Sequence, residues 1–111
     1  MKVIIAGGRD YILGADDLAR LDRELGLEVS LVISGGARGV DTDGENWAKS
    51  RGIPVERHEA RWKELGKKAG PIRNEEMARR ADMVVLFPGG KGTGSMARLA
   101  AKYELKILDW R

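Results

Sequence analysis

The sequence predicts an α/β protein in which helices cover both faces of a five-stranded parallel sheet, giving three α/β/α layers. Short apolar segments alternate with segments of helical spacing along the whole chain, a pattern typical of parallel sheets with right-handed crossovers. Glycine clusters also follow three of the apolar segments, as expected where a strand turns into a helix. The expected strand order is 3-2-1-4-5.

The first two strand and helix units are the clearest. Residues 2–6 form a nearly continuous apolar run, which predicts a fully buried strand. We expect Asp16 to cap the next helix, whose leucines recur at i, i+3 and i+7, and Gly26 to end it. Residues 29–33 repeat the strand pattern, and helical spacing follows over residues 40–48. The first half of the chain therefore predicts two consecutive βα units.

The second half follows the same plan after one irregular segment. Residues 58–70 carry mixed charge without a clean period, and we expect little more than a helical turn there. Pro71 suits the first turn of the helix that follows, and residues 96–103 mark the last helix. The remaining strands are expected at residues 53–57, 83–87 and 106–108.

Composition excludes several classes of protein. A chain of 111 residues supports one core, so residues 1–111 are expected to form a single domain. With no cysteine and one histidine, disulfide frameworks and His/Cys metal sites are not expected, and no cofactor is predicted. No apolar run approaches the ~20 residues of a membrane helix, and no signal peptide is visible, so we expect a cytoplasmic protein with no membrane contact. The net charge of +3 suits an anionic ligand, but the mixed charges do not by themselves predict nucleic-acid binding.

The glycine clusters carry the functional prediction. Gly7-Gly8 follows the first strand, residues 35–39 the second and residues 89–94 the fourth. In the expected order these strands are neighbours, so their loops converge on one edge of the sheet. Glycine lets backbone N–H groups approach an anion, and a helix N-terminus adds about half a positive charge. Gly7-Gly8 alone fits a tight turn better, but three clusters on one edge favour a phosphate site. No Walker A loop or full G-x-G-x-x-G fingerprint is present, which disfavours ordinary ATPases and NAD dehydrogenases.

Charged side chains beside the clusters extend this site. Arg9, Arg38 and Arg73 lie in or next to the joints, where a guanidinium can hold a phosphate through two hydrogen bonds. Asp10 and Asp41 are candidates to accept a proton or ribose hydroxyls, although Asp41 fits equally well as a helix cap.

Thr93 and Trp62 also have two interpretations each. The Thr93 hydroxyl can bind phosphate, cap the last helix, or do both. Trp62 can stack on a base, although a lone tryptophan in an irregular segment more often anchors that segment to the core. Trp47, at helical spacing, is expected in the core.

Four ordered motifs resemble those of a known superfamily: A-G-G-R-D at 6–10, S-G-G-A-R-G-V-D at 34–41, A-G-P-I-R-N at 69–74 and F-P-G-G-K-G-T at 87–93. They are similar to the SLOG superfamily, which joins the DNA-processing protein DprA to the LOG nucleotide phosphoribohydrolases, and most similar to its small YspA-like, YpsA-related group. The resemblance implies a Rossmann-like fold, a nucleotide-derived ligand and homo-oligomers. The predicted ligand-binding residues are Gly7, Gly8, Arg9, Asp10, Ser34, Gly35, Gly36, Arg38, Gly39, Asp41, Trp62, Arg73, Asn74, Pro88, Gly89, Gly90, Gly92 and Thr93.

The same resemblance ranks three functions. The LOG hydrolases carry a glutamate three residues after the threonine of P-G-G-x-G-T, whereas this chain has Met96, which cannot act as an acid or base; the YspA-like group tends to have an apolar residue there. We therefore expect a sensor or binding protein for a nucleotide or nucleotide-derived ligand. The first alternative is a hydrolase that cleaves the N-glycoside (LOG-like) or the phosphate ester of a nucleotide, in which Asp41 or Asp10 replaces the glutamate and Arg73 steadies the leaving phosphate. The second is a DprA-like single-stranded DNA binder, although DprA proteins are longer and no basic groove studded with aromatic residues is visible.

Overall fold

The computed structural model describes residues 1–111 and contains the predicted parallel sheet. The observed strand order is β3-β2-β1-β4-β5, and every neighbouring pair is parallel. The prediction of an α/β fold with this order is therefore confirmed. The strands are β1 (Lys2–Ala6), β2 (Leu31–Ser34), β3 (Val55–Arg57), β4 (Met83–Leu86) and β5 (Lys106–Asp109).

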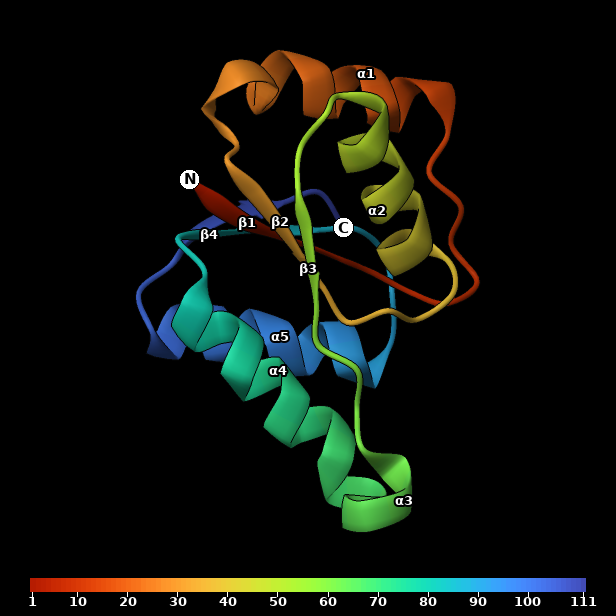
Figure 1. Ribbon diagram of the computed structural model, residues 1–111, viewed down its shortest axis with the longest axis vertical. Helices are drawn as coiled ribbons and strands as arrows, with labels where there is room; N and C mark the ends of the chain where they lie inside the picture. Colours follow the sequence, from red (N-terminus) through yellow and green to blue (C-terminus); the bar gives the residue numbers. More distant parts are fainter.

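Helices form the two outer layers (Figure 1). Helices α1 (Ala15–Glu24) and α2 (Val40–Ser50) cover one face of the sheet, and α4 (Ala69–Arg80) and α5 (Lys91–Lys102) cover the other. The irregular segment contains the short helix α3 (Trp62–Leu65), followed by a 3₁₀ turn at Gly66–Lys68. A second 3₁₀ turn lies at Gly26–Glu28. None of these helices has the length and apolar character needed to span a bilayer.

Alternating strand residues build two cores, one on each face of the sheet. In β1, Val3 and Ile5 pack with the side chains of α1 and α2, whereas Ile4 packs with Met77 of α4 and Met96 of α5. All of these side chains are buried. A strand buried on both faces needs apolar residues at successive positions, which explains the continuous apolar runs in the sequence.

The beginning of α1 differs from the prediction. The residue before the helix is Gly14, and the Asp17 carboxylate reaches back to accept a hydrogen bond from the Gly14 N–H at 3.1 Å. Asp16 is instead exposed in the first helical turn, where a negative charge still favours the helix dipole. The expected cap was therefore wrong, since the capping residue is Gly14, two positions before Asp16, and the carboxylate that bonds this residue belongs to the neighbouring Asp17; only the backbone path selects between the two aspartates.

Candidate functional site

The glycine loops meet at the carboxyl edge of the sheet, where backbone hydrogen bonds join them. The Gly8 N–H donates to the Pro88 carbonyl oxygen at 2.8 Å, and the Val40 N–H donates to the Gly8 carbonyl oxygen at 3.3 Å. A side chain would not fit in this joint, since a Cβ on Gly39 would lie 2.5 Å from the carbonyl oxygens of both Gly8 and Arg9. The glycines therefore allow three loops to pack backbone against backbone.

An open cavity of about 610 Å³ lies next to these loops and is walled by α4 and α5. Its size is in the range of small-molecule binding sites. Its lining comes from residues far apart in the sequence, which belong to all four motifs and to α3. The predicted site residues that line it are Gly7, Gly8, Arg9, Gly35, Asp41, Trp62, Arg73, Asn74, Gly90, Gly92 and Thr93.

The cavity is lined by four basic side chains and one carboxylate. The basic residues are Arg9, Arg73, Lys91 and Arg98, and the carboxylate belongs to Asp41. Arg9, Lys91 and Arg98 form no ion pair within the protein. Their charges are therefore available to an anionic ligand.

Arg73 is half-buried in the wall of the cavity. Its Nη1 donates to the Gly35 carbonyl oxygen at 2.8 Å and its Nε donates to Asn74 Oδ1 at 2.9 Å, whereas Nη2 has no protein acceptor. Burial lowers the pKa of Arg73 from its ordinary value, an effect that the charge of Asp41 opposes. A bound anion would also favour the charged guanidinium, and the free Nη2 would offer it a hydrogen bond.

Asp41, in the first turn of α2, also lies close to Gly35. A Cβ on Gly35 would come within 2.9 Å of Asp41 Oδ2 and 2.6 Å of Arg73 Nη1, so both side chains pack against this glycine. The Asp41 carboxylate accepts a hydrogen bond from the Ala37 N–H at 3.2 Å. Gly39, and not Asp41, precedes α2, so the interpretation of Asp41 as the helix cap was wrong. Burial raises the pKa of Asp41 to about 6, although the Ala37 hydrogen bond and Arg73 oppose that effect.

The raised pKa of Asp41 makes a testable prediction about stability. In the unfolded chain the carboxyl ionises near its ordinary pKa of 3.8, before it does in the folded protein. The unfolded state thus binds fewer protons between about pH 4 and 6, and stability falls as the pH rises through that window. We expect Asp41→Asn to raise the free energy of unfolding by about 1 to 3 kcal/mol at pH 8. Urea unfolding of both proteins at pH 8 and pH 3.5 tests this, and an equal difference at the two pH values would contradict it.

The predicted residues Asp10 and Arg38 lie outside the cavity. Arg38 Nη2 donates to Asp10 Oδ1 at 3.1 Å, and the two side chains are 74% and 93% exposed. They pair with each other on the protein surface because the loops turn their side chains outward from the cavity. The structure therefore does not bring them to the candidate site.

Other predicted residues hold the loops in place without lining the cavity. The buried Ser34 hydroxyl donates to Glu45 at 2.6 Å and accepts a hydrogen bond from the Gly36 N–H at 3.1 Å.

Thr93 does line the cavity, but Gly90, and not Thr93, precedes α5, so the cap interpretation of Thr93 was wrong. The remaining predicted loop residues that do not line the cavity are Gly36, Gly39, Pro88 and Gly89.

Sequence reasoning missed a buried carboxylate behind the second loop. Glu45 of α2 is 3% exposed and accepts hydrogen bonds from Arg57 Nη2 at 2.6 Å and Arg57 Nε at 3.1 Å. Burial opposes ionisation, but the bonds from Arg57 and Ser34 leave the pKa of Glu45 below its ordinary value. This network fixes the Ser34 hydroxyl, which in turn holds the Gly36 amide.

Sequence reasoning also missed the contribution of α5. Lys91, Ser95 and Arg98 line the cavity, as does the buried Met96. Lys91, Ser95 and Arg98 are spaced at i, i+4 and i+7, which places them on one side of a helix, so the spacing was a signal available in the sequence. Met96 supplies an apolar part of the wall.

Comparisons with known proteins agree with this architecture. The model of the YspA, cpYpsA-related SLOG family matches residues 1–65. The Gene 61 protein of Mycobacterium phage D29 is 44% identical in an alignment of 88 residues, and the match covers 72% of this chain and 70% of that protein. The X-ray structure of DNA processing protein A (DprA) from Streptococcus pneumoniae matches 97% of this chain with a TM-score of 0.80 and 18% identity. The match covers 49% of the DprA chain, so this chain corresponds to about half of that structure and shares its fold.

Proposed function

Since the chain belongs to the YspA, cpYpsA-related SLOG family, we propose that it binds a nucleotide or nucleotide-derived phosphate ligand in the cavity at the carboxyl edge of its sheet. One observation supports this proposal most. Three basic side chains, Arg9, Lys91 and Arg98, line the cavity beside the glycine loops and have no ion-pair partner within the protein. In this proposal the protein acts as a sensor or binding protein.

We expect the phosphate where the Gly7-Gly8 loop and the loop after β4 meet the start of α5. The first N–H groups of an α-helix have no intrahelical acceptor, and the helix dipole adds positive charge at that end. Gly90 and Gly92 line the cavity there, and a Cβ on either residue would meet no neighbouring atom within 4 Å. This leaves the backbone open to an anion, with Lys91 beside it.

Isothermal titration tests the proposal. The probes are nucleoside mono- and diphosphates, ADP-ribose, cyclic nucleotides and a single-stranded oligonucleotide, because the DprA likeness makes nucleic acid a competing partner. We expect one small-molecule ligand to bind with a sub-millimolar Kd and to weaken as salt rises. No heat from any probe at millimolar concentration would overturn the proposal, and preference for the oligonucleotide would favour the DprA-like alternative.

A substitution in the cavity lining shows whether the ligand binds in this cavity. Arg98→Ala is expected to weaken binding of the tightest probe about twofold to fivefold, as is typical for one exposed charge. Arg23→Ala is the matched control because Arg23 is exposed on α1 and does not line the cavity. Equal losses in the two variants would indicate a general charge effect and not a site at the cavity.

Asp41 supports hydrolysis as the second candidate function. It is the carboxylate among the lining residues, and its pKa of about 6 suits proton transfer near neutral pH. Asp10, the other residue considered for this role, is paired with Arg38 on the surface. Chromatography of the titration mixtures for released base distinguishes hydrolysis from binding, and Asp41→Asn should abolish any release that occurs.

A further inference from the structure

Trp62 is a large aromatic side chain that lies outside the hydrophobic core. It begins α3, is 51% exposed, and belongs to neither of the two clusters of core side chains. Its side chain lines the cavity. Trp62 therefore does not join the irregular segment to either core cluster, and its exposed surface at the cavity calls for another explanation.

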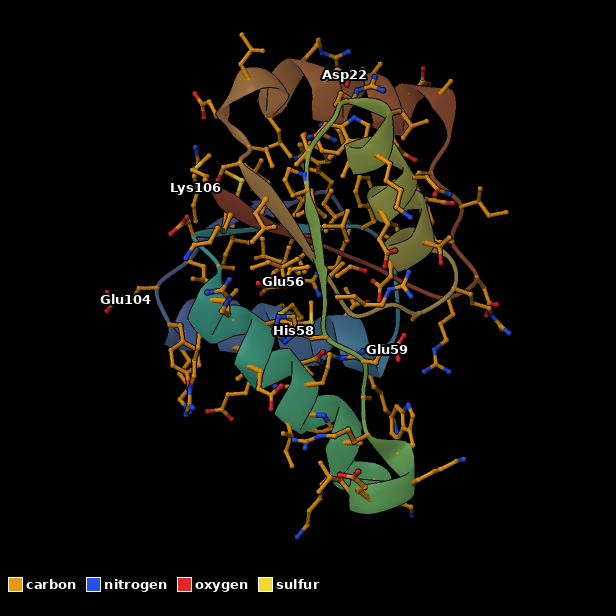
Figure 2. The ribbon with its side chains drawn as sticks, in the orientation of Figure 1. Asp22, Glu56, His58, Glu59, Glu104 and Lys106 are labelled. Atoms are coloured by element: carbon orange, nitrogen blue, oxygen red, sulfur yellow. The ribbon has the colours of Figure 1, made fainter.

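The other two tryptophans have packing partners within the protein. Trp47 is 3% exposed and donates from Nε1 to Asp22 of α1 at 2.9 Å; Asp22 is labelled in Figure 2. Trp110 packs edge-on against Phe87, with ring centroids 5.5 Å apart, and Arg20 lies over its ring. Trp62 alone combines exposure with a place at the cavity.

The Trp62 ring rests on helix α4 at a glycine. A Cβ on Gly70 would lie 3.2 Å from Trp62 Cη2 and 3.9 Å from Cζ2 and Cζ3, so the absence of a side chain lets the indole approach the helix backbone. This contact fixes one edge of the ring.

Two side chains of the segment before α3 lie close to a carboxylate of α4. Arg61 lies 3.8 Å from Glu76 of α4, and His58 Nδ1 lies 3.9 Å from the same carboxylate. His58 also contacts Glu56 of β3 at 2.7 Å, and Figure 2 shows both side chains between β3 and α4. Trp62 is therefore attached to a segment that is braced at several points.

The spacing along α4 relates Trp62 to the proposed phosphate position. Gly70, beneath the indole, is four residues before Asn74, which is about 6 Å along the helix axis. Arg73 and Asn74 face the loops from that next turn. The Trp62 ring thus lies one helical turn from side chains that can donate hydrogen bonds to a phosphate, and both line the same cavity.

We propose that Trp62 stacks on the nucleobase of the ligand, so that the cavity selects phosphate compounds carrying an intact base over the bare sugar phosphate. This inference rests on the proposed function. Stacking depends on the π-face that every base has, and so Trp62 contributes affinity without choosing among the four bases.

The test compares ligands that differ only by the base. The Kd of adenosine, guanosine, cytidine and uridine 5′-monophosphates and of ribose 5-phosphate is measured for the wild-type protein, Trp62→Phe, Trp62→Ala and the control Trp110→Phe. In the wild type we expect the monophosphates to bind about tenfold more tightly than ribose 5-phosphate. Trp62→Ala should remove most of that difference, and Trp62→Phe, which keeps an aromatic ring, should retain most of it.

Tryptophan fluorescence supplies a second readout. A nucleoside monophosphate should change the emission of the wild type and of Trp110→Phe, and the change should disappear in Trp62→Phe. Loss of affinity in Trp62→Ala that is equal for the monophosphates and ribose 5-phosphate, or no loss at all, would overturn the stacking role and leave the proposed function standing. Should none of the five probes bind the wild type, the same comparison is made with the tightest probe of the titration panel and its base-free counterpart; the proposed function itself is overturned only if every probe of that panel fails to bind.

Discussion

Gly39→Ala is expected to lower the free energy of unfolding by about 2 to 6 kcal/mol. Gly39 has φ +77° and ψ −129°, a conformation open almost only to glycine, and forcing alanine into it costs roughly 1 to 3 kcal/mol. The new Cβ would also lie 2.5 Å from the carbonyl oxygens of Gly8 and Arg9, and such overpacking adds roughly 1 to 3 kcal/mol. Since these atoms belong to the first loop, the variant should also lose ligand binding.

Gly52→Ala is the matched control for this substitution. Gly52 has a similar φ of +69°, but a Cβ there meets nothing within 4 Å. Its expected effect is therefore backbone strain alone, about 1 kcal/mol. Chemical unfolding of the three proteins measures the difference. If the two variants were equally destabilised, the close contact between the first and second loops would be wrong.

Arg73→Met is expected to weaken binding of the tightest phosphate probe by about 10- to 100-fold. Methionine keeps much of the apolar stem but removes the free Nη2 donor and the bond from Nη1 to the Gly35 carbonyl oxygen. Charge-assisted hydrogen bonds of this kind contribute about 1.5 to 3 kcal/mol. The loss should be largest for ligands with a phosphate and absent for a nucleoside without one.

Two further variants show whether the guanidinium itself matters. Arg73→Lys keeps the positive charge without the planar fork, and we expect an intermediate affinity. Arg79→Met removes a guanidinium from the same helix at an exposed position that pairs with Glu75 and Tyr103, outside the cavity. Affinity should stay at the wild-type level in Arg79→Met. Wild-type affinity in a folded Arg73→Met would remove Arg73 from the proposed site.

The architecture could be predicted because it depends on local patterns. Alternation of apolar runs and helical spacing is visible within each short segment, and a sheet buried on both faces requires it. Errors occurred where two adjacent residues serve the same purpose, as with Asp16 and Asp17 at the start of α1. The position of Thr93 inside α5 was missed for a related reason, since only the path of the backbone decides which residue precedes a helix.

The succession of strands and helices and the glycine clusters after three strands could be read from residues close together in the chain, and the neighbouring places of β2, β1 and β4 in the sheet then bring these clusters to one edge. Which side chains share the cavity depends instead on contacts between segments far apart in the sequence. Arg73 meets Gly35 across 38 positions, whereas Asp10 and Arg38, in equally suggestive motifs, turn toward each other on the surface. Exposure of Trp62 and burial of Glu45 likewise depend on packing between distant segments, which no local pattern encodes.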